Sequence, residues 1–243
     1  YLEKLPKEIK DLIEAVRQVA CLRNVPVYLV GGFVRDLILG VKNLDLDIVS
    51  EGSGIHFAQN LAAQLKSKKL IRHKRFGTAT VTVKPHLKID LATARSEAYP
   101  KPAQLPVVTA GKLKEDLLRR DFTINAMAIK IYPGDFGSVV DIFGGRRDLR
   151  NKKIRILHNL SFIDDPTRIL RAIRFEQRFD FQIEPQTMRL LKEAVKLKMI
   201  ERVEPQRTRD ELILDLKEPR PIKNIRRMQA LTGLNFISGG LRL

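Results

Sequence analysis

Residues 25–39 read VPVYLVGGFVRDLIL and predict a strand, a glycine turn and a helix in direct succession. Val25 to Val30 is rich in β-branched and aromatic residues, as strands are, and Val34 to Leu39 returns to helical spacing. Gly31 and Gly32 let backbone N–H groups approach an anion closely, and the dipole of the following helix favours negative charge there. A tight connection that binds nothing is the competing interpretation of these glycines taken alone.

Residues 44–49 read LDLDIV and predict a strand that carries two acids. Alternation along this strand places Asp45 and Asp47 on one face, about 7 Å apart. Such a pair suits hard divalent cations, with nucleotide phosphates supplying the remaining oxygens. Two solvated acids on an exposed face are the alternative, but like charges repel each other without a cation. With the glycine turn directly upstream, we expect Asp45 and Asp47 to be metal ligands.

Two further residues extend this candidate site. Asp90 lies in the strand-like run Leu87 to Ala92 and is a candidate third carboxylate that helps to activate an attacking hydroxyl. Pairing with one of the many lysines on an edge strand is the alternative. Arg35, in the first turn of the helix, offers a charged fork to a triphosphate.

The remaining pattern divides the chain into an α/β part and a helical part. In the first part, helices are expected at Pro6 to Cys21 and His56 to Lys66, and strands at Lys69 to Arg75 and Thr78 to Lys84. Arg95 to Gly111 contains three prolines and no clear period, which predicts a long loop. Beyond Asp148, helices are expected at Asp165 to Arg178, Pro185 to Leu197 and Pro205 to Lys217.

The composition is strongly basic and indicates a polyanionic partner. Lys and Arg total 45 against 28 for Asp and Glu, which gives a net charge of +17. This charge suits nucleic acid or an acidic membrane surface, and it is also common in ribosome-associated and thermophile proteins. The lone Cys21 excludes an internal disulfide framework and favours a reducing cytoplasm. No apolar run approaches the ~20 residues of a membrane span, so we expect no membrane association.

Several ordered motifs follow the glycine turn and the carboxylate pair. They are RRDFTINAMA at 119–128, then Asp141, Gly144, Gly145 and Asp148, then Asp165, Arg168, Arg171 and Arg174, and last Glu201 with Arg202. From about Val25 to Glu211 this order resembles the class II tRNA nucleotidyltransferases, which include CCA-adding, A-adding and CC-adding enzymes and the bacterial poly(A) polymerases.

The resemblance implies an architecture and a reaction. It implies a nucleotidyltransferase head with a mixed sheet and flanking helices at 1–149, an all-helical neck at 150–220 and the start of a helical body at 221–243, with the rest of the body and the tail largely absent. The start at Tyr1 in place of Met also suggests a fragment. The implied reaction uses two Mg²⁺ ions to transfer nucleotides from ATP, and from CTP in some branches, to the acceptor end of tRNA with release of pyrophosphate.

The resemblance also implies roles for the motif at 119–128. Either Arg119 or Arg120 is expected to contact the nucleotide. Because both are arginines, the sequence does not show which one does. Asp121 and Asn125 are expected to brace the head and the neck.

The base-selecting helix of the family corresponds to the segment that begins at Asp165. Asp165 and Arg168 are three residues apart, so on a helix they share a face and can meet one base edge as acceptor and donor. Cytosine and adenine both present an amino donor beside a ring-nitrogen acceptor, whereas uracil and guanine reverse this order. Arg171 and Arg174 continue the stripe and are expected at phosphates. Asp164 stands where most of the family has Glu, which alters the entry to the helix.

The sequence leaves four activities of the family as candidates, and one function outside the family. Residues 95–106 resemble the proline-rich loop of the A-adding branch, which favours addition of the terminal A. Complete CCA addition is the next candidate, followed by CC addition and poly(A) synthesis. A catalytically silent RNA-binding module predicts a lost metal pair, but Asp45 and Asp47 are both present.

Overall fold

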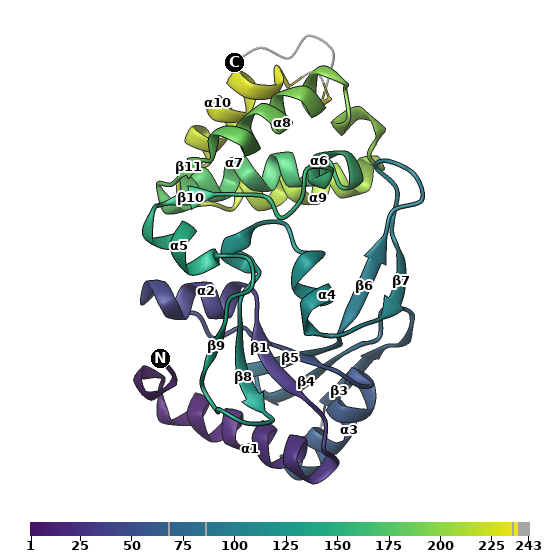
Figure 1. The fold of residues 1–243 in the computed structure, drawn as a ribbon, viewed down its shortest axis with the longest axis vertical. Helices are drawn as coiled ribbons and strands as arrows, with labels where there is room; N and C mark the ends of the chain where they lie inside the picture. The colour runs from purple at the N-terminus through teal and green to yellow at the C-terminus, as the bar shows by residue number, and fades with distance from the viewer. Residues whose placement is uncertain (68, 86, 235, 238–243) are drawn as a thin grey trace. The chain divides into compact units, whose positions relative to one another are not determined.

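The computed structural model describes residues 1–67, 69–85, 87–234 and 236–237 and divides into two compact units (Figure 1). The α/β unit comprises Tyr1–Glu97, Val108–Arg120 and Ile124–Gly145, and the helical unit comprises Ala98–Val107, Asp121–Thr123 and Arg146–Leu243. Of the expected body segment 221–243, residues 235 and 238–243 lie outside the described residues.

The α/β unit is built on a mixed seven-stranded sheet in the order β3-β4-β5-β2-β1-β8-β9. Its strands are β1 (Val27–Val30), β2 (Leu46–Ser50), β3 (Lys69–His73), β4 (Thr78–Lys84), β5 (Leu87–Thr93), β8 (Ala128–Tyr132) and β9 (Val139–Val140). Strands β2 and β5 pair in parallel, and the other neighbouring pairs are antiparallel. The expected mixed sheet is confirmed.

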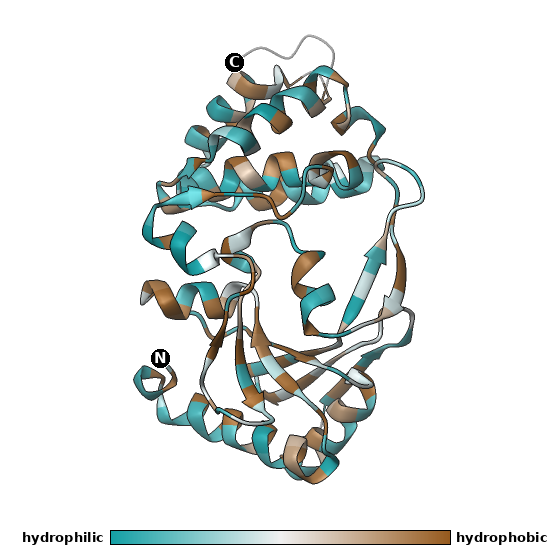
Figure 2. Ribbon diagram, viewed as in Figure 1, coloured by the Kyte–Doolittle hydropathy of each residue, from teal (hydrophilic) through white to brown (hydrophobic). Residues whose placement is uncertain are grey.

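Helices pack against the apolar side chains of this sheet. The unit contains α1 (Lys7–Arg23), α2 (Gly32–Leu39), α3 (Gly54–Gln64), α4 (Leu113–Leu118) and the short 3-10 turns Leu2–Lys4 and Lys74–Phe76. On β5, Ile89 and Leu91 are buried while Asp90 between them is half-exposed. Helix α3 packs against β4 and β5 and also against α1, whose apolar stripe is buried. Each buried aliphatic side chain contributes about 1.5–3 kcal/mol, and Figure 2 shows apolar residues along β1 and β8.

The expected loop at Arg95 to Gly111 instead contains a hairpin. Strands β6 (Arg95–Ala98) and β7 (Val107–Ala110) pair with each other, and the hydroxyls of Ser96 and Thr109 are hydrogen-bonded at 2.7 Å. The prediction of a continuous loop is therefore wrong at both ends. The three prolines lie between the strands, where a missing N–H does not disturb the pairing.

The helical unit is arranged around α7. Its elements are α5 (Gly145–Arg150), α6 (Ser161–Asp164), α7 (Thr167–Phe179), α8 (Pro185–Lys196), α9 (Pro205–Leu216), α10 (Pro221–Thr232), the 3-10 turn Ile200–Arg202, and the two-residue parallel pair β10 (Lys153–Ile154) and β11 (Gln182–Ile183). The 3-10 turn Thr123–Asn125 has Thr123 in this unit and its other two residues in the α/β unit. Proline opens α8, α9 and α10, where its missing N–H costs nothing. Helix α7 packs against α6, α9 and α10, and its Ile169, Leu170 and Ile173 are fully buried. No helix among the described residues is long and apolar enough to cross a membrane.

Candidate active site

Gly31 connects β1 to α2 in a backbone conformation that favours glycine, with φ of +71°. A Cβ at this position would lie 2.7 Å from Nη1 of Arg120 and 3.7 Å from Oδ2 of Asp47. A side chain would therefore displace the guanidinium, which shows that the turn, Arg120 and Asp47 converge on one point. The free N–H groups at the start of α2 and the neighbouring cation make this point suitable for an anion such as a phosphate.

Arg119 and Arg120 have different surroundings. Arg119 donates to Oδ1 of Asp116 at 2.7 Å and to Oε1 of Glu97 at 3.2 Å. Arg120 donates to Oδ2 of Asp116 at 2.9 Å, while its buried Nε has no hydrogen-bond partner among the described residues. Burial alone would raise the pKa of Asp116, but the two arginines outweigh it and hold the pKa below its usual value. Asp116 therefore anchors both arginines, and Arg120 is the one beside the glycine turn.

The two candidate metal ligands lie at the start of β2. The strand begins at Leu46, not at Leu44, so Asp47 is in the strand and Asp45 lies in the connection before it. Both side chains are exposed. Enclosure by the surrounding protein nevertheless raises the pKa of Asp47 to about 6; Arg120 and Lys88 lower it, and Asp90 and Asp45 raise it. The carboxylates are thus close enough to repel one another.

Asp90 stands directly opposite Asp47 in the parallel pairing of β2 with β5. Thr80 of β4, which faces Asp90 on the other side, donates its hydroxyl to Oδ1 at 2.5 Å. Nζ of Lys88 lies 3.5 Å from Oδ2. Both interpretations of Asp90 are therefore compatible with its position, because it neighbours Asp47 and also pairs with a lysine.

The donor set fits a divalent cation that arrives with a nucleotide. Among the described residues, no three His, Cys, Asp or Glu side chains converge closely enough to hold a metal ion by themselves. Asp45 and Asp47 supply hard oxygens, and the anion cradle at Gly31 is adjacent to them. A nucleotide phosphate held there would supply further oxygens, so that a metal would be shared between protein and substrate.

Arg35 is buried behind the glycine turn. Its guanidinium lies beside Gly32, but it donates to Oδ1 of Asp36 at 2.8 Å and to Oδ1 of Asn125 at 2.6 Å. These bonds connect Asn125 to α2 within the α/β unit. A contact between Arg35 and a triphosphate, and the bracing role of Asn125, stay predictions.

Asp165 begins the candidate base-reading segment but does not lie on the helix. It occupies extended backbone between α6 and α7, so the expectation that Asp165 shares a helical face with Arg168 is wrong. Its Oδ1 accepts from the hydroxyl of Thr167 at 2.6 Å and from Nη2 of Arg207 at 2.8 Å. Arg168, which is buried, donates to the hydroxyl of Ser161 at 2.7 Å.

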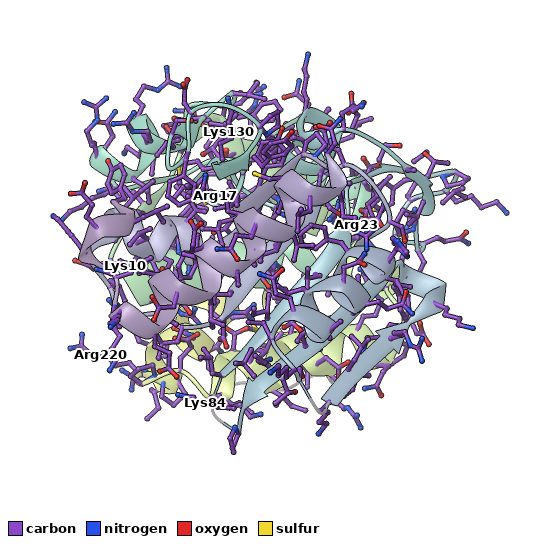
Figure 3. All side chains as sticks on the ribbon, turned by 90° about the horizontal axis from the view of Figure 1, so that it is seen from below. Lys10, Arg17, Arg23, Lys84, Lys130 and Arg220 are labelled. Carbon is purple, nitrogen blue, oxygen red and sulfur yellow. The ribbon has the colours of Figure 1, made fainter. Side chains whose placement is uncertain are left out.

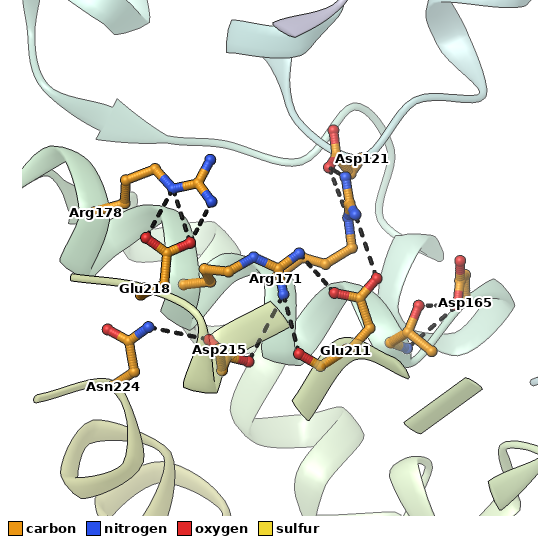
Figure 4. Close-up of polar contacts among 10 residues, drawn as sticks. Asp121, Asp165, Arg171, Arg178, Glu211, Asp215, Glu218 and Asn224 are labelled. Atoms are coloured by element: carbon orange, nitrogen blue, oxygen red, sulfur yellow. Dashed lines mark hydrogen bonds and ion pairs between the residues drawn. The ribbon is translucent and has the colours of Figure 1, made fainter. Parts of the chain in front are cut away.

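Arginines of α7 and carboxylates of α9 form a ladder inside the helical unit (Figure 4). Arg171 donates to Oδ2 of Asp121 at 2.5 Å and to Oε1 of Glu211 at 3.3 Å. Arg174 lies 2.6 Å from Oε2 of Glu211. Arg171 and Arg174 thus bind carboxylates in this structure, and their contact with phosphates stays a prediction.

The sequence alone did not indicate several residues that hold the candidate site residues in place through hydrogen bonds or ion pairs. They are Asn43, Asp116, Arg178, Arg207, Glu211, Asp215 and Glu218. One signal was available: Glu211 and Asp215 on α9 and Glu218 just after it recur every three or four residues, as the arginines on α7 do. Asp116, three and four residues before Arg119 and Arg120, was another.

Comparison with known proteins identifies the family. Residues 27–155, more than half of the chain, match the family described as the poly A polymerase head domain. Residues 180–237 match the family described as the probable RNA and SrmB-binding site of polymerase A. The chain therefore belongs to the poly A polymerase head-domain family, that of the class II tRNA nucleotidyltransferases.

Individual relatives show which members of the family are similar to this chain. The A-adding tRNA nucleotidyltransferase of Geobacter sulfurreducens is 46% identical over 98% of this chain and 27% of that protein. The A-adding tRNA nucleotidyltransferase of Halalkalibacterium halodurans is 42% identical over 94% of this chain and 55% of that protein. A solved complex of a CCA-adding enzyme with ATP is 47% identical with a TM-score of 0.89, over 99% of this chain and 55% of that one. The chain thus spans a quarter to about half of these relatives.

Proposed function

We propose that this protein is a template-independent tRNA nucleotidyltransferase that adds the terminal A to tRNA ending in CC. The observation that carries the proposal is the convergence of the Gly31 turn, Arg120 and Asp47 at one point of the α/β unit. The A-adding relatives support the choice of nucleotide. Complete CCA addition is the second candidate, because the solved relative bound to ATP is described as CCA-adding.

The reaction is an in-line attack of the tRNA 3′-hydroxyl on the α-phosphate of ATP, in which the bond to the pyrophosphate oxygen breaks. Two bound Mg²⁺ ions would lower the pKa of the attacking hydroxyl and neutralise charge on the leaving pyrophosphate. Asp45 and Asp47 would hold these ions, and Asp90 would lie beside the attacking hydroxyl. Arg120 and the N–H groups at the start of α2 would bind the triphosphate.

Base selection is assigned to Asp165 and Arg168 in the helical unit. Oδ1 of Asp165 is occupied by Thr167 and Arg207, whereas Oδ2 has no partner among the described residues, so Oδ2 is the oxygen that would accept from the amino group of adenine. Arg168 would donate to the adjacent ring nitrogen. Uracil and guanine present the opposite order and would leave both groups unpaired, which is costly. A cytoplasmic location remains the expectation from Cys21.

The test is incorporation of labelled ATP or CTP with Mg²⁺ into tRNA transcripts that end before CCA, after the first C and after CC. Addition of a single A to the CC-ended transcript alone is the expected result. Use of CTP on the shorter transcripts would favour CCA or CC addition, and a long A tail would favour a poly(A) polymerase. Binding of tRNA with no incorporation into any transcript would leave only the RNA-binding module.

A further inference from the structure

The connection from α2 to β2, residues 41–45, contains Asn43, whose side-chain amide makes a hydrogen bond through its oxygen and another through its nitrogen. This connection has neither helix nor strand. Oδ1 of Asn43 accepts the backbone N–H of Asp45 at 2.8 Å, and Nδ2 of Asn43 donates to Oδ2 of Asp36 at 2.7 Å. Asn43 therefore links a candidate metal ligand to helix α2.

The other end of this link is anchored in the interior of the α/β unit. Asp36 and Arg35 are 7% and 5% exposed, so both are nearly fixed by packing. The carboxylate of Asp36 divides its oxygens: Oδ1 binds Arg35 at 2.7 Å, and Oδ2 binds Asn43. Arg35 is in turn bonded to Asn125 at 2.6 Å. A buried and well-paired network of this kind is rigid, so it can hold a loop in one position.

The two metal ligands differ in how much they need such support. Asp47 lies inside β2, where the ladder with β5 places it opposite Asp90 and fixes its backbone. Asp45 is exposed and precedes the strand, so its position depends on the connection. The amide of Asn43 suits this link because its oxygen accepts at one end and its NH₂ group donates at the other.

We propose that Asn43 is a positioning residue for Asp45. By holding Asp45 in place, Asn43 sets the affinity of the site for its divalent cation. The inference rests on the proposed assignment of Asp45 and Asp47 as metal ligands. Residues that orient a ligand from behind typically change metal affinity or activity by about 10- to 100-fold when they are replaced. Asn43→Ala removes both bonds. Asn43→Ser keeps a short acceptor for the Asp45 amide and loses the bond to Asp36.

The experiment measures Mn²⁺ binding by electron paramagnetic resonance in the presence of the α,β-methylene analogue of ATP, which cannot react. We expect Asn43→Ala to weaken Mn²⁺ binding about 10-fold and Asn43→Ser to lie between it and the wild type. The Mg²⁺ concentration for half-maximal incorporation should rise in parallel, while the KM for tRNA stays unchanged. Asn60→Ala, which replaces a half-exposed asparagine on α3 that is bonded to Arg23 and His56, is the matched control and should bind as the wild type does.

The outcomes separate this inference from the proposed site itself. Wild-type Mn²⁺ affinity in both folded Asn43 variants would overturn the positioning role. Wild-type Mn²⁺ affinity in Asp47→Asn would overturn the metal site, whatever the Asn43 variants do. Thermal unfolding monitored by circular dichroism shows whether each variant is folded. If Asn43→Ala is unfolded, the Mn²⁺ affinity of Asn43→Ser compared with that of Asn60→Ala tests the positioning role.

Discussion

At the scale of single residues, Asp47 is the side chain whose charge the proposed reaction needs most. Asp47→Asn keeps the shape but removes the negative charge that would hold the cation, so we expect incorporation of ATP to fall by about 10³-fold. Binding of tRNA should stay the same or tighten slightly, because a negative charge is lost. Incorporation assays and filter binding measure the two effects. The exposed Asp11→Asn on α1 is the control, and an Asp47→Asn enzyme with more than half of wild-type activity would contradict the metal site.

The neighbouring arginines offer a matched pair. Arg120 lies beside the Gly31 turn, whereas Arg119 faces Glu97. Arg120→Lys keeps a charge but loses the planar fork that can bind two phosphate oxygens, so we expect the KM for ATP to rise about 10-fold. Arg119→Lys should change it less than about twofold. Steady-state kinetics with varied ATP tests this, and the reverse order of effects would show that Arg119 is the nucleotide ligand.

Sequence patterns indicated which residues of the candidate site lie close together in space when those residues are also close together in the chain. The glycine turn and the carboxylates stand close together in the chain, so their spacing carries information about geometry. The pairing of Asp47 with Asp90 depends on a parallel contact between strands 43 residues apart, which local patterns do not encode. The position of Asp165 outside the helix could have been predicted locally, because Pro166 disfavours helical backbone at the residue before it.

At the scale of elements, the junction between α6 and α7 is held by α9 through Arg207. Arg207→Gln keeps a donor but loses the charge that restrains Asp165, so we expect the ratio of ATP to UTP incorporation to fall about 10-fold. Competition assays with both nucleotides measure this ratio. Arg209→Gln, an exposed arginine on the same helix, should leave the ratio unchanged. An unchanged ratio in Arg207→Gln would mean that Asp165 does not need this support.

The contact of α7 with α9 also predicts a pH dependence. Burial raises the pKa of Asp215 to about 7; Arg174 lowers it, and Glu211 raises it again. The folded state therefore holds a proton that the unfolded chain loses near pH 4, and stability should fall as pH rises from about 4 to about 7. Asp215→Asn removes this dependence and should stabilise the protein by roughly 1 to 4 kcal/mol at pH 8, with little effect at pH 4. Urea unfolding across this range measures it.

The control for this prediction is Asp210→Asn, an exposed acid on the same helix. It should leave the pH dependence as in the wild type. A pH dependence of stability in Asp215→Asn equal to that of the wild type would show that Asp215 is ionised in the folded state.

The ladder also explains why the roles of Arg171 and Arg174 were hard to predict. A row of arginines on a helix suits phosphates and carboxylates equally well, and the deciding partners on α9 lie about 40 residues further along the chain. The hairpin at 95–110 was missed for a related reason. Its strands are four residues each, so three prolines dominated the local pattern.

At the scale of the whole molecule, the net charge of +17 predicts how RNA binding depends on salt. Basic side chains are not confined to the site: Figure 3 shows Lys10, Arg17 and Arg23 along α1. Each phosphate that such residues neutralise releases counterions into solution. If roughly four phosphates are bound, affinity for tRNA should fall about 100-fold between 50 and 200 mM salt.

The Asp47→Asn protein, for which we expect almost no incorporation, allows this dependence to be measured without turnover, by filter binding of CC-ended tRNA at several KCl concentrations. Recognition of the acceptor arm by shape predicts that tRNA binds more tightly than a DNA duplex of equal charge at every salt concentration, with similar slopes, because the electrostatic part is common to both. An affinity for tRNA that does not change with salt would mean that the basic surface does not contact phosphates. Equal affinities for tRNA and DNA would mean that charge alone, without shape, brings the substrate to this protein.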